Sequence, residues 1–252
     1  METRISTYDE HGVTIRGKSL VDDIIGEMTF TQMIYLQILG KVPTPAQVRV
    51  LDAVLVTLVD HGLAAALGAR LVYMASPDAL QGAIATGILS MGSQFGGVME
   101  EIGRNLLRIK DAADPDAEAA AVVAGYRATK ATVPGFGHPH HKPEDPRTIK
   151  LLKVAEEEGL CGAHVDALRR LAKAVDANLG KHITINATAG IAALLGEIGV
   201  PWRVMRGFAA ISRTPGIVGQ LLEEQTQPVA FKLATMAHEA VPYAGEIPPR
   251  KG

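Results

Sequence analysis

Cysteine is nearly absent from this sequence, since Cys161 is the single one among 252 residues. One cysteine excludes an intramolecular disulfide framework and fits a reducing compartment. Aromatic residues are also scarce, at 4% of the chain. Strands favour aromatic and β-branched side chains, so this shortage favours closely packed helices over sheets. Neither charge is in excess, with 25 basic and 27 acidic residues, and we therefore expect no nucleic-acid partner.

Long hydrophobic runs are missing as well. The most apolar stretches, 53–59 and 187–195, are much shorter than the roughly 20 residues of a membrane span. The N-terminus, Met1–Arg4, leads into polar sequence without the apolar run of a signal peptide. We therefore expect no membrane partner and a cytoplasmic location.

Helix start and stop signals agree with the apolar period along the chain. Thr29 and Gln32 have the spacing of a capping box, and Gly40 stands where a helix C-cap is expected. Thr44 and Gln47 repeat the box. The pattern predicts a helix at 80–105, with a break at Gly96-Gly97, and an acidic connector at 111–120 that leads into another helix. Further helices are predicted at 146–159, 165–180, 201–211 and 216–225, and a Gly–Ala-rich apolar stretch lies at 187–199. The sequence therefore predicts an all-α fold.

The stretch 133–147 is the most informative segment, because its prolines and glycines forbid regular structure. It carries three histidines, one lysine and one arginine between rigid prolines, which is a way to fix cationic donors around an anionic ligand: His138, His140, His141, Lys142 and Arg147. An ordinary solvated loop is the alternative. A metal site built from the three histidines is a further alternative, but no carboxylate or cysteine cluster completes a coordination shell, and we expect no metal.

The run Gly135-Phe-Gly-His138, with Arg147 nine positions after the histidine in Asp-Pro-Arg, resembles the signature of the citrate synthase superfamily. Other segments resemble further family blocks in the same order: Arg16–Asp22, Phe30–Thr44, Asp60-His61-Gly62, Gly92–Glu100, Ser212–Glu223 and Tyr243–Gly245. Each match is weak by itself, but together they span nearly the whole chain. The short length and the tail from Gln227 are most similar to the small citryl-CoA lyase branch.

The resemblance implies an all-α, citrate synthase-like fold with two domains. Residues 1–103 and 186–252 would form a large helical domain, and 104–185 a small coenzyme A-binding domain that closes over the ligand near Phe95, His138 and Thr188. The family assembles through large-domain helices, so a homodimer or higher homo-oligomer is expected. The glycine-rich segment 82–97 is a candidate interface, with packing inside one chain as the alternative.

The resemblance also assigns ligands to individual residues. His61, His138, Arg147 and Arg213 would surround a di- or tricarboxylate, since a planar guanidinium pairs bidentately with a carboxylate. His138 would also polarise the carbonyl or hydroxyl at the reacting bond, as a donor or general acid–base group. Coenzyme A would lie with its adenine on the main chain of Val133, Pro134, Gly135, Phe136 and Gly137, and with its phosphates near Lys142. Alternatively, His61 only caps a helix and Arg213 is a surface charge.

Two positions depart from the family pattern. Phe95 stands where the family has a histidine that donates to the thioester oxygen, and Asn186-Ala-Thr188 replaces Asn-x-Asp, whose aspartate removes the α-proton. Losing an oxyanion donor costs about 10²–10³ in rate, and losing a general base about 10²–10⁴. Citrate synthesis from acetyl-CoA is therefore not expected. Asn186 and Thr188 would instead orient the substrate or hold a water that substitutes for the base.

Three hypotheses remain open from the sequence. The first is a citryl-CoA lyase-like enzyme that makes or breaks a carbon–carbon bond next to a coenzyme A thioester. The second is a related enzyme with altered chemistry, such as a thioester hydrolase or a lyase for another hydroxy-acid ester, in which Phe95 favours a more apolar acyl group. The third is a catalytically silent subunit or sensor that binds coenzyme A or a carboxylate.

Overall fold

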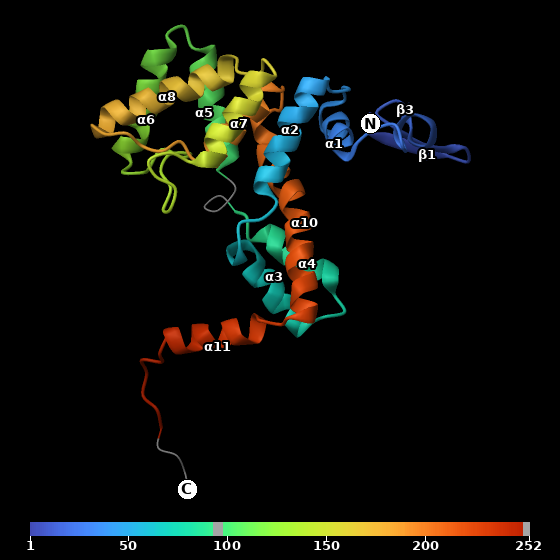
Figure 1. The fold of residues 1–252 in the computed structure, drawn as a ribbon, viewed down its shortest axis with the longest axis vertical. Helices are drawn as coiled ribbons and strands as arrows, with labels where there is room; N and C mark the ends of the chain where they lie inside the picture. Colours follow the sequence, from blue (N-terminus) through green and yellow to red (C-terminus); the bar gives the residue numbers. More distant parts are fainter. Residues whose placement is uncertain (93–97, 249–252) are drawn as a thin grey trace. The chain divides into compact units, whose positions relative to one another are not determined.

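The computed structural model describes residues 1–92 and 98–248. Within these ranges the protein is helical apart from one small sheet, and the predicted all-α class is confirmed. Figure 1 shows the order of the helices along the chain. Their bounds are α1 Phe30–Leu39, α2 Pro45–Leu58, α3 Leu63–Ala75, α4 Leu80–Leu89, α5 Met99–Asp111, α6 Pro115–Ala128, α7 Pro146–Glu157, α8 Ala163–Leu179, α9 Ala187–Glu197, α10 Met205–Thr226 and α11 Ala230–Ala240.

The N-terminus adds a small antiparallel sheet to the predicted helices. Its strands are β1 (Ser6–Asp9), β2 (Gly12–Ile15) and β3 (Lys18–Ser19), in the order β1-β2-β3. Arg16 joins this sheet to α1, because its Nε and Nη2 atoms donate to the Gln37 carbonyl at 3.0 and 2.7 Å. Carbonyls of the last helical turn have no partner inside the helix, so this contact satisfies one of them.

The two predicted capping boxes are confirmed. The Thr29 hydroxyl accepts a hydrogen bond from the Gln32 amide, while the Gln32 side chain accepts from the Thr29 amide. Thr44 and Gln47 form the same reciprocal pair before α2. Gly40 ends α1 in the left-handed conformation, as predicted for a glycine cap. These local signals determine where α1 and α2 begin.

A single helix, α10, replaces the two helices predicted at 201–211 and 216–225, and it contains Pro215. A proline inside a helix removes one backbone hydrogen bond and typically costs about 3 kcal/mol, so the sequence suggests a break there. Ile217 and Leu221 follow on the next two turns and are buried against Ala69 and Ala83. Their burial offsets the local loss, and the helix continues.

The structure also differs from the prediction around α3, α4 and α11. Neither α3 nor α11 has a side-chain cap at its start, so the sequence gives no strong signal for them. The helix predicted at 80–105 is two helices, α4 and α5, and the predicted break at Gly96-Gly97 lies outside the described residues. The last six residues of the predicted connector at 111–120 belong to α6, which Asp114 caps.

The chain packs into two compact units, each with its own core. Unit 1 comprises residues 1–58 and 93–211, and unit 2 comprises 59–92 and 212–252. In unit 1, α8 and α9 pack against α5 and bury Leu168 and Leu194 completely. The unit 2 core is smaller and consists of Ala69, Ala83, Ile217 and Leu221. The boundaries of the two units are set by how densely their residues pack together. The separate coenzyme A-binding domain expected at 104–185 stays a prediction.

In the part of the chain that the structure describes, no single helix has the length and apolarity needed to cross a membrane. Only α2 and α3 taken together as a bent pair would meet those two criteria.

Candidate active site

The segment between α6 and α7 is a loop, as the sequence predicts, and it is held against the start of α9. Phe136 forms an antiparallel bridge with Ile185. On either side of that bridge, the Gly137 amide donates to the Thr184 carbonyl at 2.8 Å, and the Asn186 amide donates to the Gly135 carbonyl at 3.0 Å. The loop therefore has a fixed backbone although it has no helix of its own.

Gly135 is required at its position for two reasons. Its φ of +91° lies in the region that side chains disfavour, and a Cβ there would lie 2.7 Å from the Ala189 Cβ and 3.0 Å from the Ile102 Cδ1 atom. The tight contact brings the loop directly onto the first turn of α9.

We expect Gly135→Ala to lower the free energy of unfolding by about 3 kcal/mol, from backbone strain and overpacking together. Chemical denaturation measures the change. Gly125→Ala is the matched control, because Gly125 is an exposed residue within α6 with open space around it. This control should raise stability by up to about 1 kcal/mol, the usual gain of alanine in a helix. Equal effects of the two substitutions would contradict the argument.

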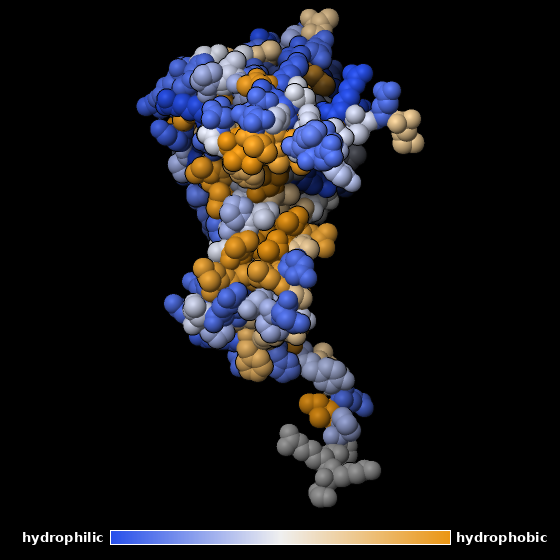
Figure 2. All heavy atoms as spheres, turned by 90° about the vertical axis from the view of Figure 1, so that its right-hand side faces the viewer, coloured by the Kyte–Doolittle hydropathy of each residue, from blue (hydrophilic) through white to orange (hydrophobic). Residues whose placement is uncertain are grey.

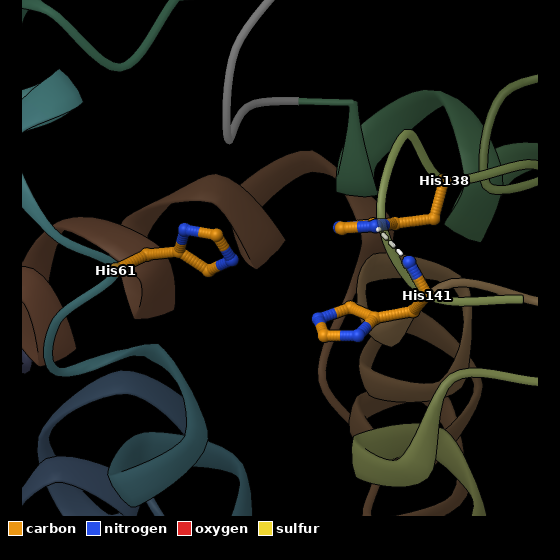
Figure 3. A group of neighbouring side chains, drawn as sticks. All are labelled: His61, His138 and His141. Atoms are coloured by element: carbon orange, nitrogen blue, oxygen red, sulfur yellow. Dashed lines mark hydrogen bonds between the residues drawn. The ribbon is translucent and has the colours of Figure 1, made fainter.

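His138 is held by the backbone of its own loop. Its Nδ1 atom accepts hydrogen bonds from the amides of His140 and His141 at 3.1 and 3.0 Å. Figure 3 shows the second of these bonds, with the rings of His138 and His141 stacked at a centroid distance of 4.3 Å. A nitrogen that accepts from two amides carries no proton, so the proton of the neutral ring is on Nε2. His138 is thereby set up as a donor through Nε2.

Arg147 is fixed beside His138 by a buried carboxylate. Asp145 is fully buried, and its two oxygens accept from Nε and Nη2 of Arg147 at 3.0 and 2.7 Å. Asp145 also caps α7 and accepts from the Ala187 amide at 3.1 Å. Burial alone would raise the pKa of Asp145, but the hydrogen bonds from Arg147 and Ala187 outweigh it and lower the pKa below its ordinary value.

The Nη2 atom of Arg147 lies 3.3 Å from the Nε2 atom of His138. With the proton of His138 on Nε2, both atoms are donors. An oxygen placed between them can accept a hydrogen bond from each, which is the arrangement that stabilises negative charge on oxygen. The sequence prediction that these two residues act on one ligand is therefore consistent with their geometry.

Asn186 and Thr188, at the start of α9, differ in what their side chains do. The Oδ1 atom of Asn186 accepts from the Ala189 amide as the helix N-cap, and its Nδ2 atom donates to the Gly137 carbonyl at 3.2 Å. Its contacts thus hold the loop in place. Thr188 is half-buried in the first turn, and no hydrogen bond of its hydroxyl occurs within residues 1–92 and 98–248.

A largely apolar pocket of about 230 Å³ lies beside the loop, inside unit 1. Val133 and Phe136 form one wall, and the last turns of α6 and α8 form the others. Polar groups at this pocket come from Arg127, Thr132 and Asn178. Lys142 is exposed on the same loop, six residues after Phe136. Two of the five predicted adenine-binding residues, Val133 and Phe136, therefore line a cavity.

Three further predicted residues belong to other parts of the chain. His61 and Arg213 belong to unit 2, and Phe95 lies outside the described residues. Arg213 is half-buried on α10, and burial lowers its pKa while the charge of Asp60 opposes that change. Its Nε atom is buried and has no hydrogen-bond partner in the described part of the chain.

Sequence reasoning missed the role of Asp145. In the sequence, Asp145 has only the pattern of a helix start, an aspartate before a proline. The signal was present in the same tripeptide, because a buried cap two positions before a functional arginine is also within reach of its guanidinium.

Comparisons with known proteins agree on one family. The model of the citrate synthase C-terminal domain matches residues 27–232. A putative citrate synthase 2 of Mycobacterium tuberculosis is 27% identical over 213 residues, covering 82% of this chain and 54% of the relative. The chain thus spans about half the length of the curated relatives it matches.

Solved structures add a relative of similar size. Citryl-CoA lyase of Hydrogenobacter thermophilus has a TM-score of 0.87 and 33% identity, covering 100% of this chain and 96% of the other. An ATP citrate lyase variant of Methanosaeta concilii, solved in complex with (3S)-citryl-CoA, has a TM-score of 0.77 at 19% identity and covers 98% of this chain and 42% of the other. The second likeness is one of fold.

Proposed function

The chain belongs to the citrate synthase family, and we propose from this premise that it is a citryl-CoA lyase-like enzyme. It would cleave or form the carbon–carbon bond of a hydroxy-polycarboxylyl-CoA thioester, with citryl-CoA, acetyl-CoA and oxaloacetate as the first candidates. The observation that carries the proposal is the pair of donors on His138 and Arg147, 3.3 Å apart and fixed by Asp145 and the loop backbone. The whole-chain likeness to a citryl-CoA lyase supports it.

In cleavage, the substrate hydroxyl gives its proton to the water that Asn186 and Thr188 are proposed to hold, and its oxygen becomes the carbonyl of a keto acid. The electrons of the broken carbon–carbon bond pass to the thioester enolate, which takes up a proton from water to give acetyl-CoA. The developing negative charge on that oxygen needs donors in place beforehand. His138 Nε2–H and Arg147 supply them. The alternative role of His138 as a base requires the proton on Nδ1, and the two amides that donate to Nδ1 disfavour that tautomer. The geometry therefore favours His138 as a donor in either direction.

Coenzyme A would bind in unit 1, with its adenine at the pocket beside Val133 and Phe136. A pocket of about 230 Å³ is smaller than the roughly 300–1,000 Å³ that hold a whole drug-sized ligand, so it suits one ring system. Lys142, exposed on the same loop, is free to reach outward to phosphates. His61 and Arg213 keep their proposed role as carboxylate-binding residues of unit 2.

The hydroxyl of Thr188 provides a prediction of its own. We expect Thr188→Val to lower kcat for citryl-CoA cleavage about tenfold, because valine keeps the shape and removes a hydrogen-bonding group worth about 1 kcal/mol or more. Steady-state kinetics measures the effect. Thr129→Val is the matched control, since Thr129 is an exposed residue at the end of α6. Unchanged turnover in Thr188→Val would exclude a role for that hydroxyl.

A second candidate function follows from Phe95 and Thr188, which replace the family's donor and base. These substitutions favour a thioester hydrolase, a lyase for another hydroxy-acid ester, or a silent binding subunit. A panel of hydroxyacyl-CoA esters, with products identified by mass spectrometry, separates the possibilities. Acetyl-CoA and keto acid support the lyase, whereas free coenzyme A alone supports a hydrolase. Binding without any product supports the silent subunit.

We also propose that the chain forms a homo-oligomer through unit 2. Large apolar side chains are exposed on this unit, including Leu89 on α4, Leu222 on α10 and Phe231 on α11, at 81%, 61% and 76%. Figure 2 shows apolar side chains at the surface on the side that it draws. Apolar surface of this kind marks an interaction site more often than a free surface. Sedimentation velocity would distinguish a dimer or higher oligomer from a monomer.

A further inference from the structure

Unit 2 contains a buried arginine that none of the predicted roles uses. Arg70 on α3 is fully buried, and its Nη1 atom donates to Glu224 of α10 at 2.7 Å. Glu223 pairs with the same guanidinium. Burial alone would raise the pKa of Glu224, but hydrogen bonds from the Ala230 amide and Arg70 outweigh it and leave the pKa lowered. Arg70 is thus a fixed, charged anchor between α3 and α10.

Arg70 determines how the side-chain amide of Gln220 is oriented. The Nε and Nη2 atoms of Arg70 both donate to the Gln220 Oε1 atom, at 3.1 and 2.6 Å. Guanidinium nitrogens only donate, so the oxygen of the amide must face Arg70. The Gln220 Nε2 atom consequently faces the other way and donates to the Asp60 Oδ2 atom at 3.0 Å.

Asp60 in turn holds the turn that carries His61. Its Oδ1 atom accepts from the Gly62 amide at 2.5 Å, and Gly62 has a φ of +76°. The turn is also pressed against α10, because a Cβ on Gly216 would lie 1.9 Å from the Val59 carbonyl oxygen. The backbone on both sides of His61 therefore has a defined position relative to α10.

The Asp60 carboxylate also affects the pKa of Arg213. The charge of Asp60 opposes the lowering of the Arg213 pKa by burial, so it stabilises the charged guanidinium on α10. The geometry agrees, because a Cβ on Gly216, three residues after Arg213 in α10, would lie 3.4 Å from the Asp60 Oδ2 atom. The side chain that Gln220 and Arg70 hold in place is therefore next to His61 in sequence and close to the turn of α10 that follows Arg213.

We propose that Asp60 is a positioning residue that holds His61 and Arg213 in their ligand-binding arrangement, through the relay Arg70–Gln220–Asp60. This inference rests on the proposed function for the identity of the ligand, while the relay itself is a property of unit 2.

The test exchanges the hydrogen-bond donor and acceptor between residues 60 and 220. In Asp60→Asn, the Gly62 amide keeps its acceptor, but the new amide nitrogen faces the Gln220 nitrogen, and two donors meet. We expect KM for citryl-CoA to rise about tenfold while kcat changes less than about threefold, the size of one lost hydrogen bond to a charged group in a binding role. Asp60→Asn combined with Gln220→Glu restores a donor–acceptor pair and the total charge. Its KM should return to within about threefold of the wild type.

Gln225→Glu is the control, because Gln225 is an exposed residue on the same helix and the same charge change there should leave KM unchanged. A wild-type KM in Asp60→Asn would overturn the proposal, as would a double variant no better than the single one. Hydrogen exchange of the Gly62 amide is measured in parallel. If the wild type turns over no ester, the proposed function fails. The relay is still supported in that case if the Gly62 amide exchanges faster in Asp60→Asn and the added Gln220→Glu substitution restores the slower exchange. Unchanged exchange decides against it.

Discussion

His138→Ala is expected to lower kcat for citryl-CoA cleavage by about 10²–10⁴, with a smaller change in KM. The substitution removes the Nε2 donor from the oxygen on which charge develops, and loss of one such donor costs about 10²–10³. Any proton transfer by the ring would be lost with it, which extends the range. Arg147 would remain in place, since Asp145 rather than His138 holds its guanidinium.

The control for this prediction is His140→Ala. His140 is exposed, its hydrogen bond to His138 comes from its backbone amide, and its ring makes only an edge contact with the His138 ring at a centroid distance of 6.1 Å. Its side chain is therefore dispensable, and we expect activity within about twofold of the wild type, as for most surface substitutions. Equal losses in the two variants would indicate a general effect on the loop, and an active His138→Ala would remove His138 from the reaction.

Asp145→Ala is expected to lower the free energy of unfolding by about 3 kcal/mol, because removing one partner of a buried ion pair leaves the other without compensation. The substitution also leaves the Ala187 amide without its acceptor. Asp114→Ala is the matched control: Asp114 also precedes a proline and caps a helix, but it is exposed. A cap alone is worth about 1 kcal/mol, and chemical denaturation of both variants isolates the buried contribution. Equal losses would contradict the account.

The sign of the pH dependence follows from the lowered pKa of Asp145. The folded state favours the charged carboxylate, so this contribution is fully present above the unfolded pKa of about 3.9. It is lost as the pH falls through the unfolded value and then through the lower folded one. The stability difference between wild type and Asp145→Ala should therefore be constant near neutral pH and shrink below about pH 4. A difference that grew on acidification would be inconsistent with the ion pair.

Local signals explain which parts of the fold the sequence predicts. The capping boxes at Thr29 and Thr44 act within four residues, so their spacing alone predicts where α1 and α2 begin. Pro215 leads to a wrong prediction because its local effect favours a helix break. The burial of Ile217, which offsets that effect, comes from residues far away in the sequence. No residue in the three strands of the N-terminal sheet is fully buried, so the strands show no alternation of buried apolar and exposed polar residues that would reveal them.

The sequence likewise predicts some features of the candidate site and not others. Prolines and glycines identify the loop, and its family resemblance identifies His138 and Arg147. The tautomer of His138 depends on two backbone amides, and the function of Asn186 as a cap and loop clamp depends on the position of Gly137. Contacts of this kind follow from the folded backbone, so residue types alone could not predict them. The contribution of Asp60 is a further example, since its partner Gln220 is 160 positions away.

The most direct test is the mass balance of wild-type protein incubated with citryl-CoA. The lyase account predicts equal amounts of acetyl-CoA and oxaloacetate, little free coenzyme A, and formation of both products at least about 100-fold more slowly with His138→Ala. Release of coenzyme A and citrate in equal amounts, without acetyl-CoA, would contradict the account and support hydrolysis of the thioester instead.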